Sequence, residues 1–153
     1  MQLTDILTLE RVSCDSQAGS KKRVLEQLSE LAASGQDTLS RAEIFDSLLA
    51  RERLGSTGLG HGIAIPHGRI KNSDKTIGAF IKLREGIDYD AMDHQPVDLL
   101  FALLVPEQST EEHLNLLAQL AEMFSNAEVV ARLRSATSAA ALLDTIRAWQ
   151  NDH

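Results

Sequence analysis

The stretch from Val97 to Val105 restricts the possible folds of this chain more than any other feature. Asp98 is its only polar residue, and Pro106 ends it. An apolar run of this length is too short to cross a bilayer, so we expect no segment inserted in a membrane. It has the length of a strand that is covered on both faces. The stretch therefore predicts a β-sheet with helices packed on both sides.

Two further stretches have the pattern of strands. Apolar residues alternate from Ile77 to Leu83, as in a half-buried strand, and Ile63 to Ile65 predicts a short strand that Pro66 ends. This places His67 at the carboxyl end of a strand. Residues 85–96 are expected to form a loop or hairpin.

Helices are predicted where a capping residue precedes apolar residues at helical spacing. The expected caps are Ser20, Ser40, Ser109, Ser125 and Ser138, and Gly35 is the expected end of the first helix. The apolar stripes are Val24, Leu28 and Leu31; Ile44, Phe45, Leu48 and Leu49; Leu114, Leu117, Ala121 and Phe124; and Leu142, Leu143, Ile146 and Trp149. Helices interleaved with strands predict an α/β fold, with residues 1–153 as a single domain and a folded core of about residues 3–150.

Charge and composition exclude several classes of protein. The formal charge is −7, from 22 acidic residues against 15 Lys and Arg, and no basic stripe is present, so nucleic acid is not an expected partner. The first ten residues include acidic side chains and do not form a signal peptide. Cys14 is the sole cysteine and cannot form an internal disulfide. We expect a cytoplasmic protein.

The segment from Gly55 to Gly68, GSTGLGHGIAIPHG, contains five of the nine glycines and predicts a ligand-binding turn. His67 follows a proline and precedes a glycine, which would present its ring to solvent. An imidazole that is neutral near pH 7 can accept a phosphoryl group. If the strands run parallel, His113 lies at the same edge of the sheet as His67 and can donate a hydrogen bond to the phosphoryl group. Arg51 can supply a permanent positive charge.

Other interpretations of these residues remain open. His67 is also a common type of turn residue, His113 could simply cap a helix, and Arg51 could be a solvated helix-end cation. The glycines lack the Lys-Ser or Lys-Thr of a P-loop, and no G-x-S-x-G turn occurs. A metal site built from His61, His67 and His113 is conceivable, but no compact ligand motif supports it, so we expect neither metal nor cofactor.

The stretch RERLGSTGLGHGIAIPHGR, from Arg51 to Arg69, closely resembles enzyme IIA of the mannitol and fructose type in the bacterial phosphotransferase system, above all its nitrogen-regulatory branch. The segments SKKRVLEQLSELAA, PVDLLFALLVP and EEHLNLLAQLAEMF follow in the order and spacing of this family. The resemblance implies a mixed sheet of about five strands sandwiched between helices. The chain differs from the nitrogen-regulatory branch at His61, where members of the branch more often have a small amide or acidic residue. The role of His61 stays open.

The resemblance also implies roles for individual residues. His67 would accept the phosphoryl group on Nε2 from a phosphohistidine of a small HPr-like carrier protein. His113 would donate a hydrogen bond to the phosphoryl group, and Arg51 would balance its charge. Thr57 would place a hydroxyl near the pocket. His94 matches no functional position.

The function implied by the resemblance is a regulatory switch linked to nitrogen and potassium. Its phosphorylation state would decide which regulatory proteins it binds, such as sensor kinases or potassium transport components. No IIB, IIC or HPr-like segment is recognisable in the chain, which favours this prediction. The alternatives are a sugar-specific IIA protein that passes phosphate to a cysteine of a IIB partner, and a binding module in which His67 is never phosphorylated.

Overall fold

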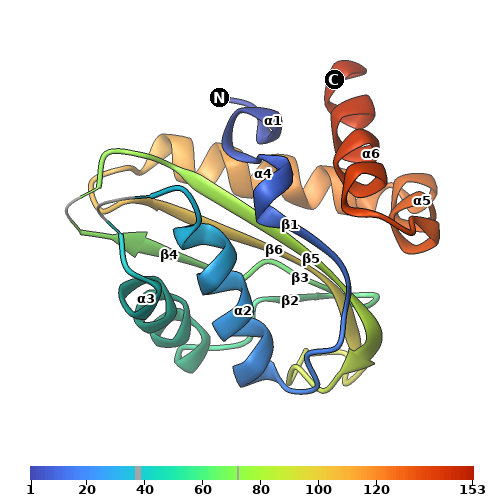
Figure 1. Ribbon diagram of the computed structural model, residues 1–153, viewed down its shortest axis with the longest axis horizontal. Helices are drawn as coiled ribbons and strands as arrows, with labels where there is room; N and C mark the ends of the chain where they lie inside the picture. The colour runs from blue at the N-terminus through green and yellow to red at the C-terminus, as the bar shows by residue number, and fades with distance from the viewer. Residues whose placement is uncertain (37–38, 72) are drawn as a thin grey trace.

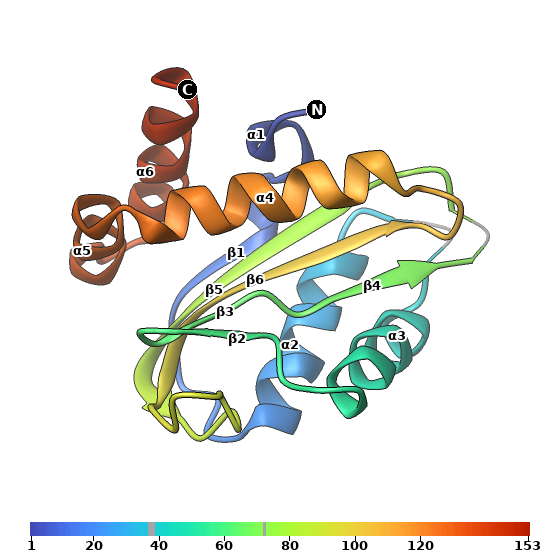
Figure 2. The same ribbon diagram turned by 180° about the vertical axis from the view of Figure 1, so that it is seen from behind.

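A mixed β-sheet lies between two groups of helices in the computed structural model of the protein, which describes residues 1–36, 39–71 and 73–153 (Figure 1). Helices α2 and α3 cover one face, and α1, α4, α5 and α6 cover the other (Figures 1 and 2). The elements are α1 (Leu3–Ile6), η1 (Leu9–Arg11), β1 (Val12–Ser16), α2 (Lys21–Ala33), α3 (Arg41–Arg53), β2 (Gly58–Gly60), β3 (Ile63–Ala64), β4 (His67–Ile70), β5 (Ile77–Ile87), β6 (Val97–Pro106), α4 (Glu111–Ser125), α5 (Ala127–Ser135) and α6 (Ala139–Asn151). The predicted α/β sandwich is confirmed.

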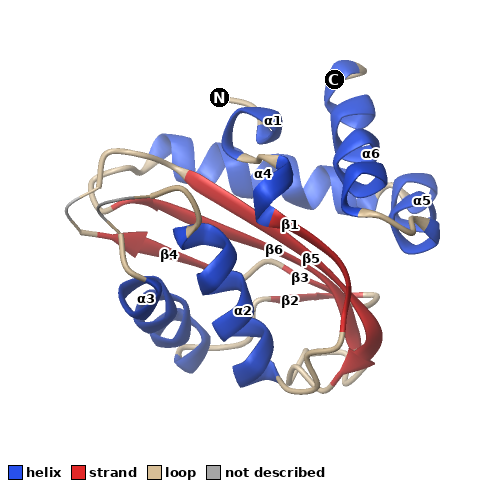
Figure 3. Ribbon diagram, viewed as in Figure 1, coloured by secondary structure: helices blue, strands red, loops and turns tan. Residues whose placement is uncertain are grey.

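The sheet has six strands among the described residues, in the order β1-β5-β6-β3-β2, and β4 also pairs with β6 (Figure 3). Strands β5 and β6 are antiparallel, whereas β3 and β4 both run parallel to β6. Ile63 pairs with Leu99, and His67 pairs with Leu103. The mixed sheet is confirmed, with one strand more than the approximate number expected.

The main difference from the expected strands concerns the chain on either side of Pro66. The strand expected over 63–65 ends at Ala64, and a new strand, β4, begins at His67. His67 is therefore the first residue of a strand and not the residue after one. Proline has no N–H for the ladder, so it interrupts the pairing. The Pro66 carbonyl nevertheless accepts a hydrogen bond from the Leu103 amide at 3.0 Å, which returns the chain to β6.

Strands β1 and β2 were not expected from the sequence. Strand β1 is rich in small polar residues, and β2 reads Gly-Leu-Gly. Glycine and small polar residues have low strand propensity, so neither segment has a local strand signal. Pairing with β5 and β3, respectively, makes them strands.

Three of the expected helix caps are confirmed. The hydroxyls of Ser20, Ser40 and Ser138 each accept a hydrogen bond, at 3.1 Å, from the backbone amide three residues later. Helix α2 ends at Ala33, shortly before Gly35, which adopts a left-handed φ of 77°. Glycine adopts this conformation without strain, which accounts for the end of the helix here.

The other two expected caps are wrong. Asn126 caps α5, because its side-chain oxygen reaches two backbone amides at 3.0 and 3.2 Å. The Ser125 hydroxyl instead donates to the Glu122 carbonyl at 2.6 Å, inside α4. Thr110 stands at the N-cap of α4 without a side-chain hydrogen bond, so Ser109 does not cap it either.

The buried stripe of α4 also differs from the predicted one. Leu114 was expected to face inward but is 66% exposed. The buried residues are His113, Leu116, Leu120, Met123 and Phe124. This helix has leucines on several sides, so its spacing alone does not identify the side that packs on the sheet.

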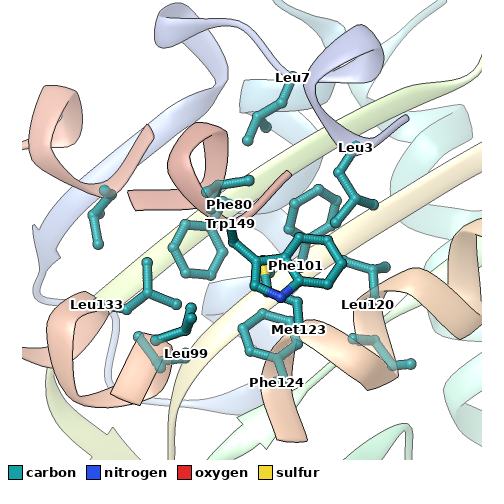
Figure 4. Close-up of a cluster of buried hydrophobic side chains, with 14 of the residues drawn as sticks. Leu3, Leu7, Phe80, Leu99, Phe101, Leu120, Met123, Phe124, Leu133 and Trp149 are labelled. Carbon is teal, nitrogen blue, oxygen red and sulfur yellow. The ribbon is translucent and has the colours of Figure 1, made fainter. Parts of the chain in front are cut away.

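Hydrophobic cores fill both sides of the sheet. Alternate residues of β6 point to opposite faces: Leu99, Phe101 and Leu103 pack under α1, α4 and α6, while Leu100, Ala102 and Leu104 pack under α2 and α3. Figure 4 shows the first core, where the ring centroid of Phe80 lies 5.9 Å from that of Phe101 and 6.3 Å from that of Phe124. Burial on both faces explains why β6 is almost entirely apolar. None of the described helices has the length and apolar character needed to cross a membrane.

Candidate functional site

A cleft of about 770 Å³ opens between α3, β4 and the start of α4. These three segments lie toward the same end of the sheet (Figure 2). The lining of the cleft consists of Glu43, Asp46, Ser47, Ala50, Arg51, Leu54, His67, Gly68, Arg69, Ile70, Lys71 and His113. Three of the residues predicted from the sequence, Arg51, His67 and His113, are thus brought together. Strands β4 and β6 run parallel, and α4 follows β6 in the chain. The first turn of α4 therefore places His113 beside His67.

Gly68 allows α3 to lie close to β4 at the floor of the cleft. A Cβ atom at this position would overlap the side chain of Ser47 and stand only 3.1 Å from the Ser47 carbonyl oxygen. The Ser47 hydroxyl donates a hydrogen bond to the Arg69 carbonyl at 2.8 Å, which ties the helix to the strand. This contact brings the end of α3, with Arg51, beside His67.

His67 is held in one tautomer. Its Nδ1 lies 2.7 Å from the Ile65 carbonyl oxygen. A carbonyl can only accept a hydrogen bond, so Nδ1 carries the proton and Nε2 of the neutral ring carries the lone pair. Burial lowers the pKa of His67 below its ordinary value of 6.5, and the nearby Arg51 charge lowers it further, against opposing effects of the Ile65 hydrogen bond and Glu52. The half-buried ring is therefore a neutral nucleophile near pH 7.

His113 lies next to His67 in the first turn of α4. The ring centroids are 5.4 Å apart, and the planes are tilted by 52°. The side chain is largely buried, and its Nδ1 has no hydrogen-bond partner among the described residues. Burial lowers the pKa of His113, and the charges of His67 and Arg69 add to this effect. The neutral ring can offer an N–H to an anion bound at His67.

Two arginines give the cleft positive charge. Arg51, in the last turn of α3, donates from Nη1 to the Gly55 carbonyl at 2.8 Å, and it has no carboxylate partner within the ranges that the structure describes. Arg69 was not predicted. It donates to the carbonyls of Glu107, at 3.0 Å, and Ser109, in the connection that leads to α4. Its position two residues after His67 on one strand, hence on the same face, is the signal that could have identified it.

Thr57 does not line the cleft. Its side chain is buried, its hydroxyl donates to the Glu52 carboxylate, and it lies 3.3 Å from the Tyr89 hydroxyl. Glu52, which the sequence reasoning missed, also pairs with Lys21 at 3.0 Å. Burial, with the negative charge of Glu52, raises the pKa of Tyr89, which stays protonated. The predicted hydroxyl is thus not part of the cleft lining.

The remaining histidines lie elsewhere. The exposed His61 has a left-handed φ of 57°, and its amide donates to Asp93 at 3.0 Å. It is not part of the cleft lining, so the structure does not bring His61 to His67 and His113. His94, also exposed, sits in the loop before β6. Within residues 1–36, 39–71 and 73–153, no three His, Cys, Asp or Glu side chains are grouped as metal ligands.

A protein family matches nearly the whole chain. It is described as "Phosphoenolpyruvate-dependent sugar phosphotransferase system, EIIA 2", and the match spans residues 5–149. The chain belongs to this EIIA 2 family. Membership implies a phosphocarrier component of a phosphotransferase system.

Similar EIIA 2 proteins identify the branch that the chain resembles. A "Nitrogen regulatory protein" of Pseudomonas aeruginosa is 50% identical over 151 residues, covering 99% of this chain and 98% of that protein. The crystal structure of nitrogen regulatory protein IIA-Ntr from Neisseria meningitidis is 44% identical, with a TM-score of 0.89 over 94% of this chain and 98% of that one. The predicted resemblance to the nitrogen-regulatory branch is confirmed.

The fold is also that of the mannitol type. IIA mannitol from Escherichia coli aligns with a TM-score of 0.75 at 23% identity, over 92% of this chain and 98% of that one. At this identity the likeness concerns the fold alone. It confirms the predicted mannitol-type EIIA fold.

Proposed function

We propose that the chain is a cytoplasmic histidine phosphocarrier with a regulatory output. His67 accepts a phosphoryl group on Nε2 from a phosphohistidine of an HPr-like carrier protein. The hydrogen bond from Nδ1 to the Ile65 carbonyl is the observation that carries this proposal, because it leaves the Nε2 lone pair free in an open cleft. The nitrogen regulatory relatives support the regulatory output.

The transfer step follows from the positions of the side chains. The Nε2 lone pair of His67 attacks phosphorus, and the bond from phosphorus to the donor histidine breaks. Its electron pair stays on the donor ring, which leaves as a neutral imidazole because its other nitrogen carries a proton. The His67 proton stays on Nδ1, hydrogen bonded to Ile65. Charge spread over the phosphoryl oxygens is stabilised by the Arg51 guanidinium and by an N–H of His113.

The regulatory output follows from the charge that the phosphoryl group adds. A phosphoryl group brings roughly −1.5 to −2 charges at pH 7. Here the phosphoryl group would lie beside Arg51 and Arg69, in an open cleft that the surface of a partner protein can reach. The two forms would therefore bind different regulatory proteins, for which sensor kinases and potassium transport components are our candidates.

A donor test distinguishes the proposal from its main alternative. The purified chain is incubated separately with the phosphorylated carriers of the nitrogen branch and of the sugar branch, and its intact mass is measured. We expect one phosphoryl group from the nitrogen-branch donor, and none on His67→Ala. Labelling by the sugar-branch donor alone would indicate a sugar-specific IIA that passes phosphate to a IIB cysteine. Labelling of His67→Ala would show a different acceptor.

A binding test addresses the regulatory switch. Both forms of the protein are immobilised and exposed to lysate of the producing cell, and the captured proteins are compared. We expect at least one protein that is retained by only one form. Identical sets for both forms and for His67→Ala would indicate a binding module that does not depend on phosphorylation.

A further inference from the structure

A cluster of polar side chains that do not line the cleft has no role in the transfer step described above. It consists of Lys21, Glu52, Thr57 and Tyr89, which we call the carboxylate clamp. The Glu52 side chain is only 2% exposed and accepts from Lys21 Nζ at 3.0 Å. The same Nζ lies 4.5 Å from the centroid of the Tyr89 ring. The clamp thus joins the start of α2, the end of α3 and the loop after β5.

Both oxygens of the Glu52 carboxylate hold Thr57. One accepts from the Thr57 amide at 3.2 Å, and the other accepts from the Thr57 hydroxyl. A buried ion pair contributes little net stability compared with apolar side chains of similar volume, because both charges lose water. Stability alone therefore does not account for a carboxylate here, and its geometry suggests that it orients the turn.

Two hydrogen bonds lead from the clamp to the ring of His67. The Thr57 carbonyl accepts from the Ile65 amide at 3.1 Å. The Ile65 carbonyl accepts from His67 Nδ1 at 2.7 Å. The position of Thr57 therefore determines the position of the carbonyl that keeps the His67 proton on Nδ1.

The same turn also directs Arg51. The Gly55 amide donates to the Glu52 carbonyl at 3.1 Å, and the Gly55 carbonyl accepts from Arg51 Nη1 at 2.8 Å. The guanidinium of Arg51 and the ring of His67 are thus both attached to residues 55–65. Glu52 and Thr57 hold the beginning of that segment.

We propose that Glu52 and Thr57 are positioning residues for phosphoryl transfer: by fixing the turn over residues 54–57, they keep the His67 proton on Nδ1 and aim Arg51 at the phosphoryl group. Neither side chain lines the cleft or touches the reacting atoms. The inference rests on the proposed function, since it assigns these residues to the same transfer step.

The test uses conservative substitutions of Thr57 and Glu52. Thr57→Val removes the hydroxyl and keeps the shape, Glu52→Gln removes the charge, and Thr57→Ser retains the hydroxyl. Thr145→Val is the matched control, because the Thr145 hydroxyl is also buried and donates to a backbone carbonyl, Ala141, at 2.8 Å in α6. The variants are compared by imidazole ¹⁵N NMR, which reports the tautomer of His67 without any donor, and by single-turnover phosphorylation.

We expect Thr57→Val and Glu52→Gln to increase the population of the Nε2–H form of His67 and to slow phosphorylation roughly ten- to a hundredfold, as for a modest misplacement of reacting groups. Thr57→Ser should recover most of the lost rate. Thr145→Val should change neither readout, although it also loses the hydrogen bond of a buried hydroxyl.

An unchanged His67 tautomer and an unchanged rate in folded Thr57→Val would overturn the inference. Equal slowing in Thr145→Val would do the same, because it would indicate a general effect of destabilisation. If Glu52→Gln does not fold, the comparison of Thr57→Val with Thr57→Ser still tests whether the Thr57 hydroxyl positions the turn. If the unsubstituted chain takes no phosphoryl group from any donor, the proposed function fails, while the NMR comparison still tests the clamp.

Discussion

The chemistry of His67 depends on a single backbone contact. The Ile65 carbonyl holds the proton on Nδ1 and leaves Nε2 as the nucleophile. An exposed histidine would interconvert between two tautomers and would be half protonated at its ordinary pKa of about 6.5. Partial burial and the Arg51 charge favour the neutral ring at lower pH.

The lowered pKa of His67 predicts how phosphorylation depends on pH. Because the ordinary value is 6.5 and burial lowers it, the ring remains a nucleophile as the pH falls through 6.5. We therefore expect the single-turnover rate with a fixed donor to fall to half its plateau value at a pH below 6.5. A rate that falls to half at 6.5 would contradict the lowered pKa.

The lowered pKa values of His67 and His113 also predict that the protein becomes less stable at acid pH. The unfolded chain protonates its histidines near 6.5, whereas burial opposes protonation of His67 and His113 in the folded protein. The free energy of unfolding should therefore fall as the pH drops below 6.5 and should be unaffected by these groups well above it. Urea denaturation over this range measures the effect, and His113→Gln should reduce the slope.

His113 should matter for transfer much more than for folding. His113→Ala removes a donor to the phosphoryl oxygens, and we expect the transfer rate to fall about 10²- to 10³-fold, as for the loss of one oxyanion donor. The ring lines an open cleft, so the fold should survive. Rapid-quench phosphorylation and circular dichroism measure the two quantities. A normal rate in the folded variant would exclude His113 from the site.

At the scale of elements, the site depends on the contact between α3 and β4. Arg51 belongs to the helix and His67 to the strand, and their separation is set by how closely Gly68 lets Ser47 approach. The helix is itself well defined locally, since Ser40 caps it. The distance from α3 to β4, by contrast, depends on how the two elements pack against each other.

Gly68→Ala should disturb this contact. The added methyl group would overlap the Ser47 side chain and make a tight contact with its carbonyl group, and we expect a loss of about 1–3 kcal/mol in the free energy of unfolding, as in other overpacked sites. Phosphorylation should slow as well, because Arg51 moves away from His67. Gly19→Ala is the control, since nothing lies within 4 Å of its added Cβ. Equal stability of the two variants would contradict this account of the cleft.

At the scale of the whole molecule, the two cores share the sheet between them. Strands β5 and β6 contribute side chains to both faces, so neither core can unfold without exposing the back of the other. Trp149, the sole tryptophan, lies in the core under α1, α4 and α6 (Figure 4). Its fluorescence can therefore report whether this core unfolds together with the core under α2 and α3.

A substitution on the opposite face tests this coupling. Leu28, in α2, is fully buried, and Leu28→Ala should lower the free energy of unfolding by about 2–5 kcal/mol. We expect Trp149 fluorescence and far-ultraviolet circular dichroism to shift together to lower urea. A fluorescence transition that stays at the wild-type midpoint would show that the two cores unfold independently.

Features encoded in neighbouring residues could be predicted from the sequence. The apolar stretch from Val97 to Val105 indicated a sheet covered on both faces, and Ser20, Ser40 and Ser138 cap helices as expected. These signals arise from side-chain spacing and from hydrogen bonds across three residues, so they do not depend on the rest of the fold. The motif from Arg51 to Arg69 likewise identified Arg51 and His67, which meet in the cleft, whereas Thr57 of the same motif does not line it.

Features that depend on a distant partner could not be predicted in this way. Strand β2 exists because its glycines pair with β3, and the side of α4 that is buried depends on how the helix lies across the sheet. Glu52 pairs with Lys21, which is remote in the sequence. Pairing, burial and the loss of water around a charge depend on which segments meet in space, and local spacing carries no information about that.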